Sequence, residues 1–272
     1  ASSPSYCSAR LVEGSALDPL VRAVTRQRAV YWALLLVCAT AAGITVLSPL
    51  PASLAQVPPT NIPKPLLVAA NFGLILVLYG LLGLLGLHLA ARNSWPGVFK
   101  EGAGWRELVL RPLWLGAASG AFIIVGSRWF GLFHHLGPLP HPPFPFSLSA
   151  SFAAGIGEEL LMRLVLMSCW AWLLRRLFGR FQAKRFTDGM AVIIAAAIFG
   201  LAHLAGQVYL AGFKSLGDIP GIFIVEMLVL NGVLGILAGR EMIANGFVAA
   251  VGIHFWADIV WHVLYGSLGS GA

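Results

Sequence analysis

The chain has 272 residues, of which 58% are hydrophobic and only 11% are charged. A soluble domain carries roughly 25% charged residues, so this composition excludes an ordinary soluble protein and predicts an integral membrane protein. The formal net charge of +7 has a sign that suits nucleic acid, but the basic residues follow the membrane topology predicted below, and no nucleic-acid partner is expected. The three cysteines match no metal-ligand spacing.

Seven apolar stretches reach the roughly 17–25 residues that a membrane-spanning helix needs. In chain order they are Val30–Leu50, Leu66–Ala91, Leu113–Phe130, Phe152–Leu174, Met190–Leu210, Ile219–Ala238 and Asn245–Tyr265. The sequence therefore predicts an all-α, polytopic transmembrane helix bundle of about seven spans. We divide it into an N-terminal region, residues 1–150, with about three transmembrane helices and an interfacial segment, and a catalytic core, residues 151–272, with about four.

Lysines and arginines predict the orientation of the bundle. With the N-terminus in the cytoplasm and alternating spans, most of the 18 lysines and arginines lie on the cytoplasmic side, as the positive-inside rule requires. The main clusters are Arg22–Arg28, Arg92–Arg111 and Arg175–Arg185. We therefore expect a multi-pass protein of a prokaryotic plasma (inner) membrane, with its basic residues close to anionic lipid.

Two segments between the predicted spans carry polar or aromatic residues that we do not assign to a functional site. From Arg92 to Arg111 charges alternate with Trp95, Phe99 and Trp105, which predicts an interfacial segment with aromatic anchors. The predicted outer loop Gly131–Pro145 contains five prolines and three histidines. No helical spacing presents these histidines (His134, His135 and His141) together, so we interpret them as solvated loop residues.

The fourth predicted span carries three charged residues, Glu158, Glu159 and Arg163. A charge at the bilayer centre costs at least about 2.5–3.5 kcal/mol, so such residues are usually functional. Glu159 and Arg163 are four positions apart and can form an ion pair on one helical face. Glu158 points about 100° away and is left to face other neighbours. Gly155 and Gly157 let another helix approach closely, and the alternative role is a polar contact that only holds helices together.

Two later spans add polar side chains one helical turn apart. In the fifth span Phe199 precedes His203 by four positions and could shield its imidazole, although a lone histidine is also typical of an inter-helix hydrogen bond. In the seventh span His254 and Asp258 have the same spacing. Either Asp258 holds His254 in one tautomer, or both side chains face one cavity.

The depths of these residues predict a single site. Glu158, His203 and Asp258 each lie about seven residues from the outer end of their predicted spans, which is about 10 Å at 1.5 Å per residue. Three helices then contribute to one polar intramembrane cavity. Glu226, in contrast, looks solitary, and His262 fits an interfacial belt better than a site.

The ordered motifs resemble those of a known family. Three spans carry them in sequence: Glu158-Glu159-x-x-x-Arg163, Phe199-x-x-x-His203 and His254-x-x-x-Asp258. This set resembles the CAAX prenyl endopeptidase family, also called the Abi or CPBP family of intramembrane proteases. The resemblance covers roughly Phe152 to Tyr265.

The resemblance implies a glutamate-type peptidase. The residues matching Glu158 and His203 would activate a water for attack on a peptide bond, and those matching His254 and Asp258 would support the oxyanion. Glu159 and Arg163 would be structural or orienting, as would the shielding ring of Phe199.

One position departs from the family pattern. The prenyl-protein endopeptidases have asparagine where this chain has Asp258. The amide of asparagine donates a hydrogen bond, whereas an ionised aspartate cannot. Either Asp258 is protonated, or it orients His254 and leaves that imidazole as the donor.

We therefore expect an intramembrane endopeptidase that cuts a membrane-anchored protein or peptide substrate near its anchored, C-terminal end. The bilayer is its other partner, and no cofactor is expected. In an alternative, Glu158, His203 and His254 form the His₂Glu ligand set of a catalytic zinc site, although no HExxH motif is present. A non-enzymatic alternative is a proton-linked transporter, or a membrane scaffold or immunity-type protein.

Overall fold

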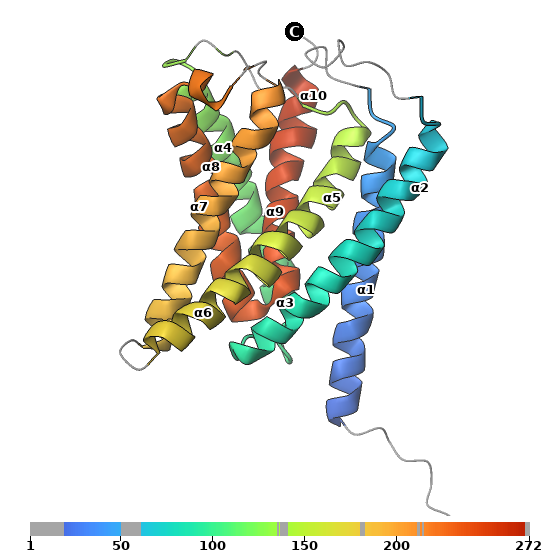
Figure 1. Cartoon of the computed structure of the whole chain (residues 1–272), viewed down its shortest axis with the longest axis vertical. Coiled ribbons are helices and arrows are strands. Elements are labelled where there is room, and N and C mark those ends of the chain that lie inside the picture. Colours follow the sequence, from blue (N-terminus) through green and yellow to red (C-terminus); the bar gives the residue numbers. More distant parts are fainter. Residues whose placement is uncertain are drawn as a thin grey trace, which may run out of the picture.

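The computed structural model describes residues 19–49, 61–134, 136, 141–179, 183–210, 213 and 215–269. Every regular element in these ranges is a helix, and no strand occurs among them (Figure 1). The predicted all-α fold is therefore confirmed.

The helices join end to end into longer segments because short π-helical turns continue several of them. The elements are α1 (Pro19–Thr45); α2 (Lys64–Leu74), η2 (Ile75–Tyr79) and α3 (Gly80–Arg92); η3 (Arg106–Leu110) and α4 (Arg111–Phe130); α5 (Phe146–Glu159), η4 (Leu160–Met167) and α6 (Ser168–Phe178); α7 (Lys184–Leu210); η5 (Leu216–Asp218) and α8 (Gly221–Asn245); and α9 (Phe247–Asp258), η6 (Ile259–Tyr265) and α10 (Gly266–Gly269). Apart from the short η5, the described residues form seven long helical segments, as predicted.

Six of these segments are long and apolar enough to cross a membrane. They are Ala23–Thr45, Lys64–Arg92, Arg106–Phe130, Lys184–Gly206, Gly221–Asn245 and Phe247–Leu268. The seventh, α5–η4–α6, is long as well but carries Glu158, Glu159 and Arg163 within its length. The protein is therefore a multi-pass membrane protein, and the long segment outside these six spans is the one that carries the predicted carboxylates.

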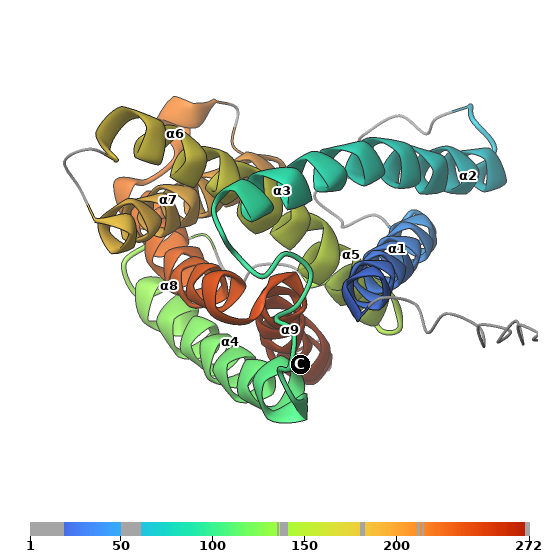
Figure 2. The same ribbon diagram turned by 90° about the horizontal axis from the view of Figure 1, so that it is seen from below.

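Helix α9 belongs to the most buried of the six candidate spans. It packs against α4, α5 and α8, and α8 in turn packs along α7. Seen from below, the α5–η4–α6 segment separates α1 and α2 from the group formed by α4, α8 and α9 (Figure 2). This arrangement brings α5, α7 and α9 together, although they come from distant parts of the sequence.

Glycine allows the close contact between α5 and α9. A Cβ atom at Gly155 would lie 3.1 Å from both the Cα and the amide nitrogen of Phe255, so any side chain there would press on the backbone of α9. At Gly157 a Cβ atom would lie 3.0 Å from Cε2 of Tyr79. The prediction that these two glycines permit close helix approach is confirmed.

The seventh segment begins two residues later than predicted. Asn245 ends α8, and Gly246 makes the turn into α9 with a φ of 97°, a left-handed value that favours glycine. The amide of Phe247 then donates to the carbonyl of Gly97 at 2.9 Å. The turn is thus held by backbone contacts with a distant segment, which hydropathy does not reveal.

That distant segment differs from the predicted aromatic anchor. Trp95 and Phe99 are 6% and 4% exposed and belong to the core, whereas Trp105 is exposed. The amide of Lys100 donates to the carbonyl of Asn245 at 2.9 Å. The prediction of interfacial anchoring was therefore wrong for Trp95 and Phe99, because this segment folds back under the α8–α9 turn and is covered by it.

Candidate active site

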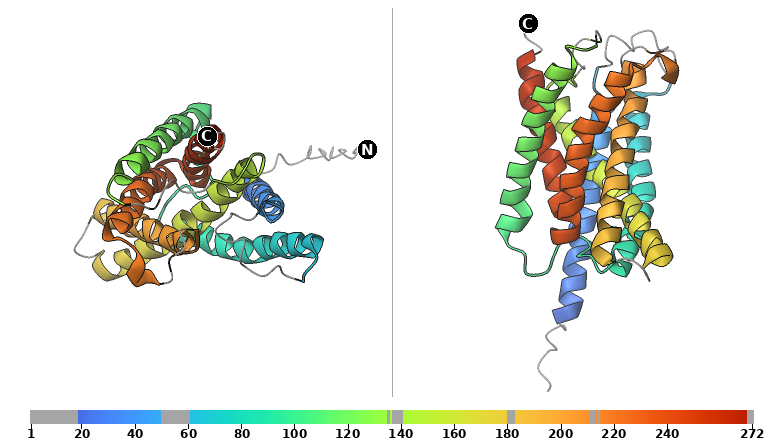
Figure 3. Two further views of the ribbon diagram at one scale, coloured as in Figure 1. Left: turned by 90° about the horizontal axis from the view of Figure 1, so that it is seen from above. Right: turned by 90° about the vertical axis from the view of Figure 1, so that its left-hand side faces the viewer.

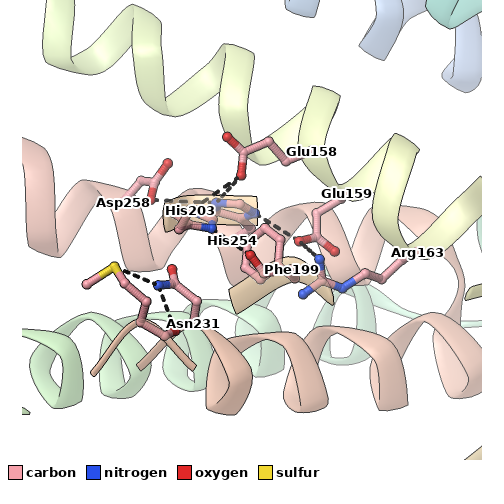
Figure 4. A network of polar contacts seen from close by, with 9 residues as sticks. Glu158, Glu159, Arg163, Phe199, His203, Asn231, His254 and Asp258 are labelled. Carbon is pink, nitrogen blue, oxygen red and sulfur yellow. Dashed lines mark hydrogen bonds and ion pairs between the residues drawn. The ribbon is translucent and has the colours of Figure 1, made fainter. Parts of the chain in front are cut away.

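Three helices bring the motif residues together, as Figure 4 shows. Glu158 and Glu159 are the last two residues of α5, and the π-helical η4 begins directly after them. Asp258 is likewise the last residue of α9, where η6 begins. Interruptions of this kind are frequent at functional sites because they turn side chains away from regular α-helical positions.

Glu158 faces two imidazoles from two other helices. Its Oε2 atom lies 3.8 Å from Nε2 of His203 and 3.9 Å from Nε2 of His254. These distances exceed hydrogen-bond length and leave room for a third molecule to contact all three groups. The Glu158 side chain is 42% exposed, so its carboxylate is open to a reactant. The predicted convergence of α5, α7 and α9 is confirmed.

The backbone of α7 fixes the tautomer of His203. Nδ1 of His203 lies 2.8 Å from the carbonyl oxygen of Phe199. A carbonyl only accepts, so Nδ1 donates, and Nε2 of the neutral ring is then an acceptor. This acceptor faces Glu158.

Glu159 orients His254. Nδ1 of His254 donates to Oε1 of Glu159 at 2.8 Å, and Nε2 is thereby directed toward Glu158 and toward Oδ1 of Asp258, 3.7 Å away. The hydrogen bond that orients the ring thus comes from Glu159 rather than from Asp258. Of the two arrangements predicted for His254 and Asp258, the geometry matches the one in which both face the same cavity.

Arg163 forms a buried ion pair with Glu159, the carboxylate that orients His254. Nη1 of Arg163 lies 3.2 Å from Oε1 of Glu159, and both side chains are almost fully buried, so the predicted ion pair is confirmed. The guanidinium also lies 4.2 Å from the ring centre of Phe199. Phe199 in turn meets the imidazole of His203 edge-on, with ring centres 4.6 Å apart, which matches its predicted shielding position.

A cavity of about 90 Å³ borders the two imidazoles that Glu158 faces. Its lining includes His203, His254 and Asp258, and from α8 it includes Asn231. A water molecule needs only about 10–15 Å³ of such space together with polar partners, so the cavity has room for several. In Figure 4 Glu158 and Asn231 lie on opposite sides of the imidazoles.

Asn231 was not among the predicted site residues. Its Nδ2 donates to the carbonyl of Met227 at 3.1 Å and also contacts the thioether sulfur of Met227 at 3.9 Å. A thioether is a weak acceptor, so the amide can exchange this second contact for a stronger acceptor. The sequence did contain a signal, an amide inside the apolar stretch Ile219–Ala238. Asparagine carries no charge, so the high cost that marks an ionisable residue in an apolar span does not single it out.

Two predictions about the outer region were wrong. Nε2 of His134 lies 2.7 Å from Oε2 of Glu226, and both side chains are buried, so Glu226 is not solitary. Nδ1 of His141 lies 3.1 Å from Nδ1 of His262. These two loop histidines contact the bundle instead of solvent, because the chain after α4 folds back over α8 and η6. His135 lies outside the described residues.

Fold and site together define a polytopic membrane protein with a carboxylate–imidazole site inside its helical bundle. Residues 140–260 match a family described as Type II CAAX prenyl endopeptidase Rce1-like, and this range contains all three motifs. This part of the chain, somewhat less than half of its length, is therefore similar to the CAAX prenyl endopeptidases, a family of proteases. No curated protein and no solved structure matches it.

Proposed function

We propose that this protein is an intramembrane endopeptidase in which Glu158 and His203 activate a water molecule. The observation that carries the proposal is the position of the Glu158 carboxylate, less than 4 Å from the Nε2 atoms of two imidazoles on separate helices. A carboxylate beside two imidazoles that border a cavity large enough for water is suited to general acid–base hydrolysis.

In the proposed reaction Glu158 accepts a proton from water as the water oxygen bonds to the peptide carbonyl carbon. The resulting tetrahedral intermediate carries its negative charge on the former carbonyl oxygen. The proton then passes to the amide nitrogen, the C–N bond breaks, and a carboxylic acid and an amine are released. His203 presents Nε2 toward Glu158, so it can accept and return the same proton.

His254 is the proposed stabiliser of the oxyanion. Carboxylates lie near both of its ring nitrogens, Glu159 at Nδ1 and Asp258 at Nε2, and the proposed donor is the imidazolium form, with a proton on each nitrogen. That form donates from Nε2 into the cavity. Asp258 cannot donate in its ionised form, whereas an amide donates without any change of charge, so we assign the neutral donor to Asn231, which borders the same cavity. Each such donor typically contributes 10²–10³-fold to the rate, roughly.

The proposed substrate is a membrane-anchored protein or peptide, cut near its anchored C-terminal end. A site built between transmembrane helices is reached most directly by a chain that is itself held in the bilayer. The enzyme is proposed to lie in a prokaryotic plasma membrane with its N-terminus in the cytoplasm. This orientation follows from the excess of arginine and lysine at one end of the bundle.

The test is proteolysis by the full-length protein in liposomes, with a reporter anchored by a C-terminal hydrophobic helix. We expect Glu158→Ala to lower the cleavage rate by at least about 10²-fold, the usual size of a general-base contribution. Glu107→Gln is the matched control, since Glu107 is an exposed carboxylate on η3 and its loss should leave the rate unchanged. Full cleavage by Glu158→Ala would overturn the assignment.

The same liposome preparation also distinguishes the glutamate mechanism from the zinc alternative. In the described part of the chain no group of three or more His, Cys, Asp or Glu side chains is arranged to hold a metal ion. Metal content should therefore be measured on active protein. Stoichiometric zinc, with activity lost on chelation and restored by zinc, would replace the glutamate mechanism by a zinc site at Glu158, His203 and His254.

A further inference from the structure

A groove lies between α7 and α8 at the end of the bundle far from the loop that precedes α5. The first turns of α7 and the last turns of α8 form its two sides, and Arg111 at the start of α4 closes one end. Its volume is about 540 Å³. The right-hand view of Figure 3 shows α7 and α8 running alongside each other toward this end.

The carboxylates in this groove already have partners. Glu241 pairs with Arg111, with 2.7 Å between Oε1 and Nη2. Asp188 pairs with both Arg175 and Lys184. These contacts neutralise the negative charge of the groove from within the protein.

Two guanidinium groups in the groove remain without a carboxylate. Arg185 on α7 and Arg240 on α8 line it and are exposed, and no ion pair joins either one to another described residue. Two uncompensated arginines on facing helices are suited to an anion that offers several acceptor oxygens, such as a phosphate group.

The walls of the groove become apolar toward the middle of the bundle. Ile236 lies one turn before Arg240 on α8, and Ile193 lies eight residues after Arg185 on α7, about 12 Å along the axis. Both isoleucines line the groove, and they are 38% and 56% exposed. The groove is thus charged at the ends of the helices and apolar nearer the middle of the bundle. A lipid has the same polarity, with a charged headgroup at the membrane surface and an apolar acyl chain below it.

We propose that this groove binds one anionic phospholipid. Arg185 and Arg240 hold the phosphate and its anionic headgroup, and an acyl chain lies against Ile193 and Ile236. Basic pockets between transmembrane helices at the membrane surface bind anionic lipid headgroups in this way. The site is separate from the proposed active site, whose side chains line a different cavity.

Native mass spectrometry of the full-length protein in an uncharged detergent tests the proposal. Phosphatidylglycerol and phosphatidylcholine with the same acyl chains are added in parallel. We expect phosphatidylglycerol to be retained at one molecule per protein and phosphatidylcholine to be lost. The double variant R185Q/R240Q should weaken phosphatidylglycerol retention by about 30-fold, from the usual contribution of two basic residues at an anionic surface.

The matched control is R92Q/R176Q. It removes the same charge from exposed residues at the ends of α3 and α6, which lie outside the groove, and it should retain the lipid as the wild type does. Equal losses in the two double variants would overturn the site, because they would indicate a general effect of charge.

Two further measurements distinguish a lipid phosphate from a soluble phosphate as the bound group. Ile236→Trp fills the apolar part of the groove without changing its charge and should also release phosphatidylglycerol. Inorganic phosphate and glycerol 3-phosphate should fail to displace the lipid at equal concentration. Displacement by either one, or full retention by Ile236→Trp, would mean that the groove takes a soluble anion and would overturn the lipid assignment.

Discussion

At the residue scale the chemistry depends on which nitrogen of each histidine reaches the cavity. His203 and His254 both use Nδ1 in a hydrogen bond within the protein, one to a backbone carbonyl and the other to Glu159. Both therefore present Nε2 toward Glu158. The second glutamate of the pair thus has a role distinct from the first, since it orients a ring that the first one faces.

Asn231 and Asp258 provide a test of how the oxyanion is stabilised. Asn231→Leu keeps a side chain of similar shape but removes the amide, so we expect kcat to fall about 10²-fold with KM little changed. Asp258→Asn introduces a second amide on the opposite wall of the cavity and should restore part of that loss in the double variant.

The contrast between kcat and KM makes this test specific. A variant that only disturbed packing would lower the amount of folded protein, measured by thermal unfolding in detergent, without this pattern of rescue. Unchanged kcat in Asn231→Leu would remove Asn231 from the mechanism and leave His254 as the sole proposed donor.

At the scale of the helices, much of the fold could be predicted from the sequence, because a spanning helix needs only sufficient apolar length. Glu158, Glu159, Arg163, His203 and His254 could be identified because ionisable groups are rare in such stretches. Asn231 carries no charge and was missed. The His134–Glu226 pair joins residues 92 positions apart, and no local pattern reveals a contact of that kind. The π-helical turns that follow Glu159 and Asp258 also depend on tertiary packing.

The approach of α5 to α9 gives a prediction at this scale. Gly155→Leu places a side chain against the backbone of Phe255, which should push the helices apart and destabilise the fold by about 1–3 kcal/mol, the usual range for overpacking. Since Glu158 lies three residues further along α5, its separation from His254 should increase and cleavage should fall as well.

Thermal unfolding in detergent and the cleavage rate of the folded fraction are the two measurements. Gly73→Leu is the control, because a Cβ atom at Gly73 on α2 meets nothing within 4 Å. If Gly155→Leu unfolds and cleaves as the control does, the close packing of α5 on α9 is not what positions Glu158.

At the scale of the whole molecule the candidate site lies between two distinct ends. One end carries the basic groove of α7 and α8. At the other, His141 in the segment before α5 packs on η6, with its ring centre 4.7 Å from that of Trp261 and its Nδ1 atom 3.1 Å from Nδ1 of His262. Trp261 and His262 also line the cavity of the candidate site. The segment that contains His141 therefore covers residues that belong to the wall of that cavity.

This contact should depend on pH in a defined direction. Burial lowers the pKa of His141 below its ordinary value of 6.5, so its imidazole is neutral when docked and is more easily protonated when released. The contact is then complete above about pH 6.5 and weakens as the pH falls from there toward the lowered pKa.

Hydrogen exchange at the backbone amides of His141 and Phe144 measures the docking, because the other residues of the segment 141–145 are prolines and have no N–H. We expect protection at pH 7.5 and faster exchange at pH 5.5, after correction for the intrinsic pH dependence of exchange. His141→Phe keeps an aromatic ring against Trp261 and Tyr265 but does not titrate, so its protection should be the same at both pH values. If the pH dependence persists in His141→Phe, another group controls the segment, and the half-buried imidazole of His141 is not the sensor.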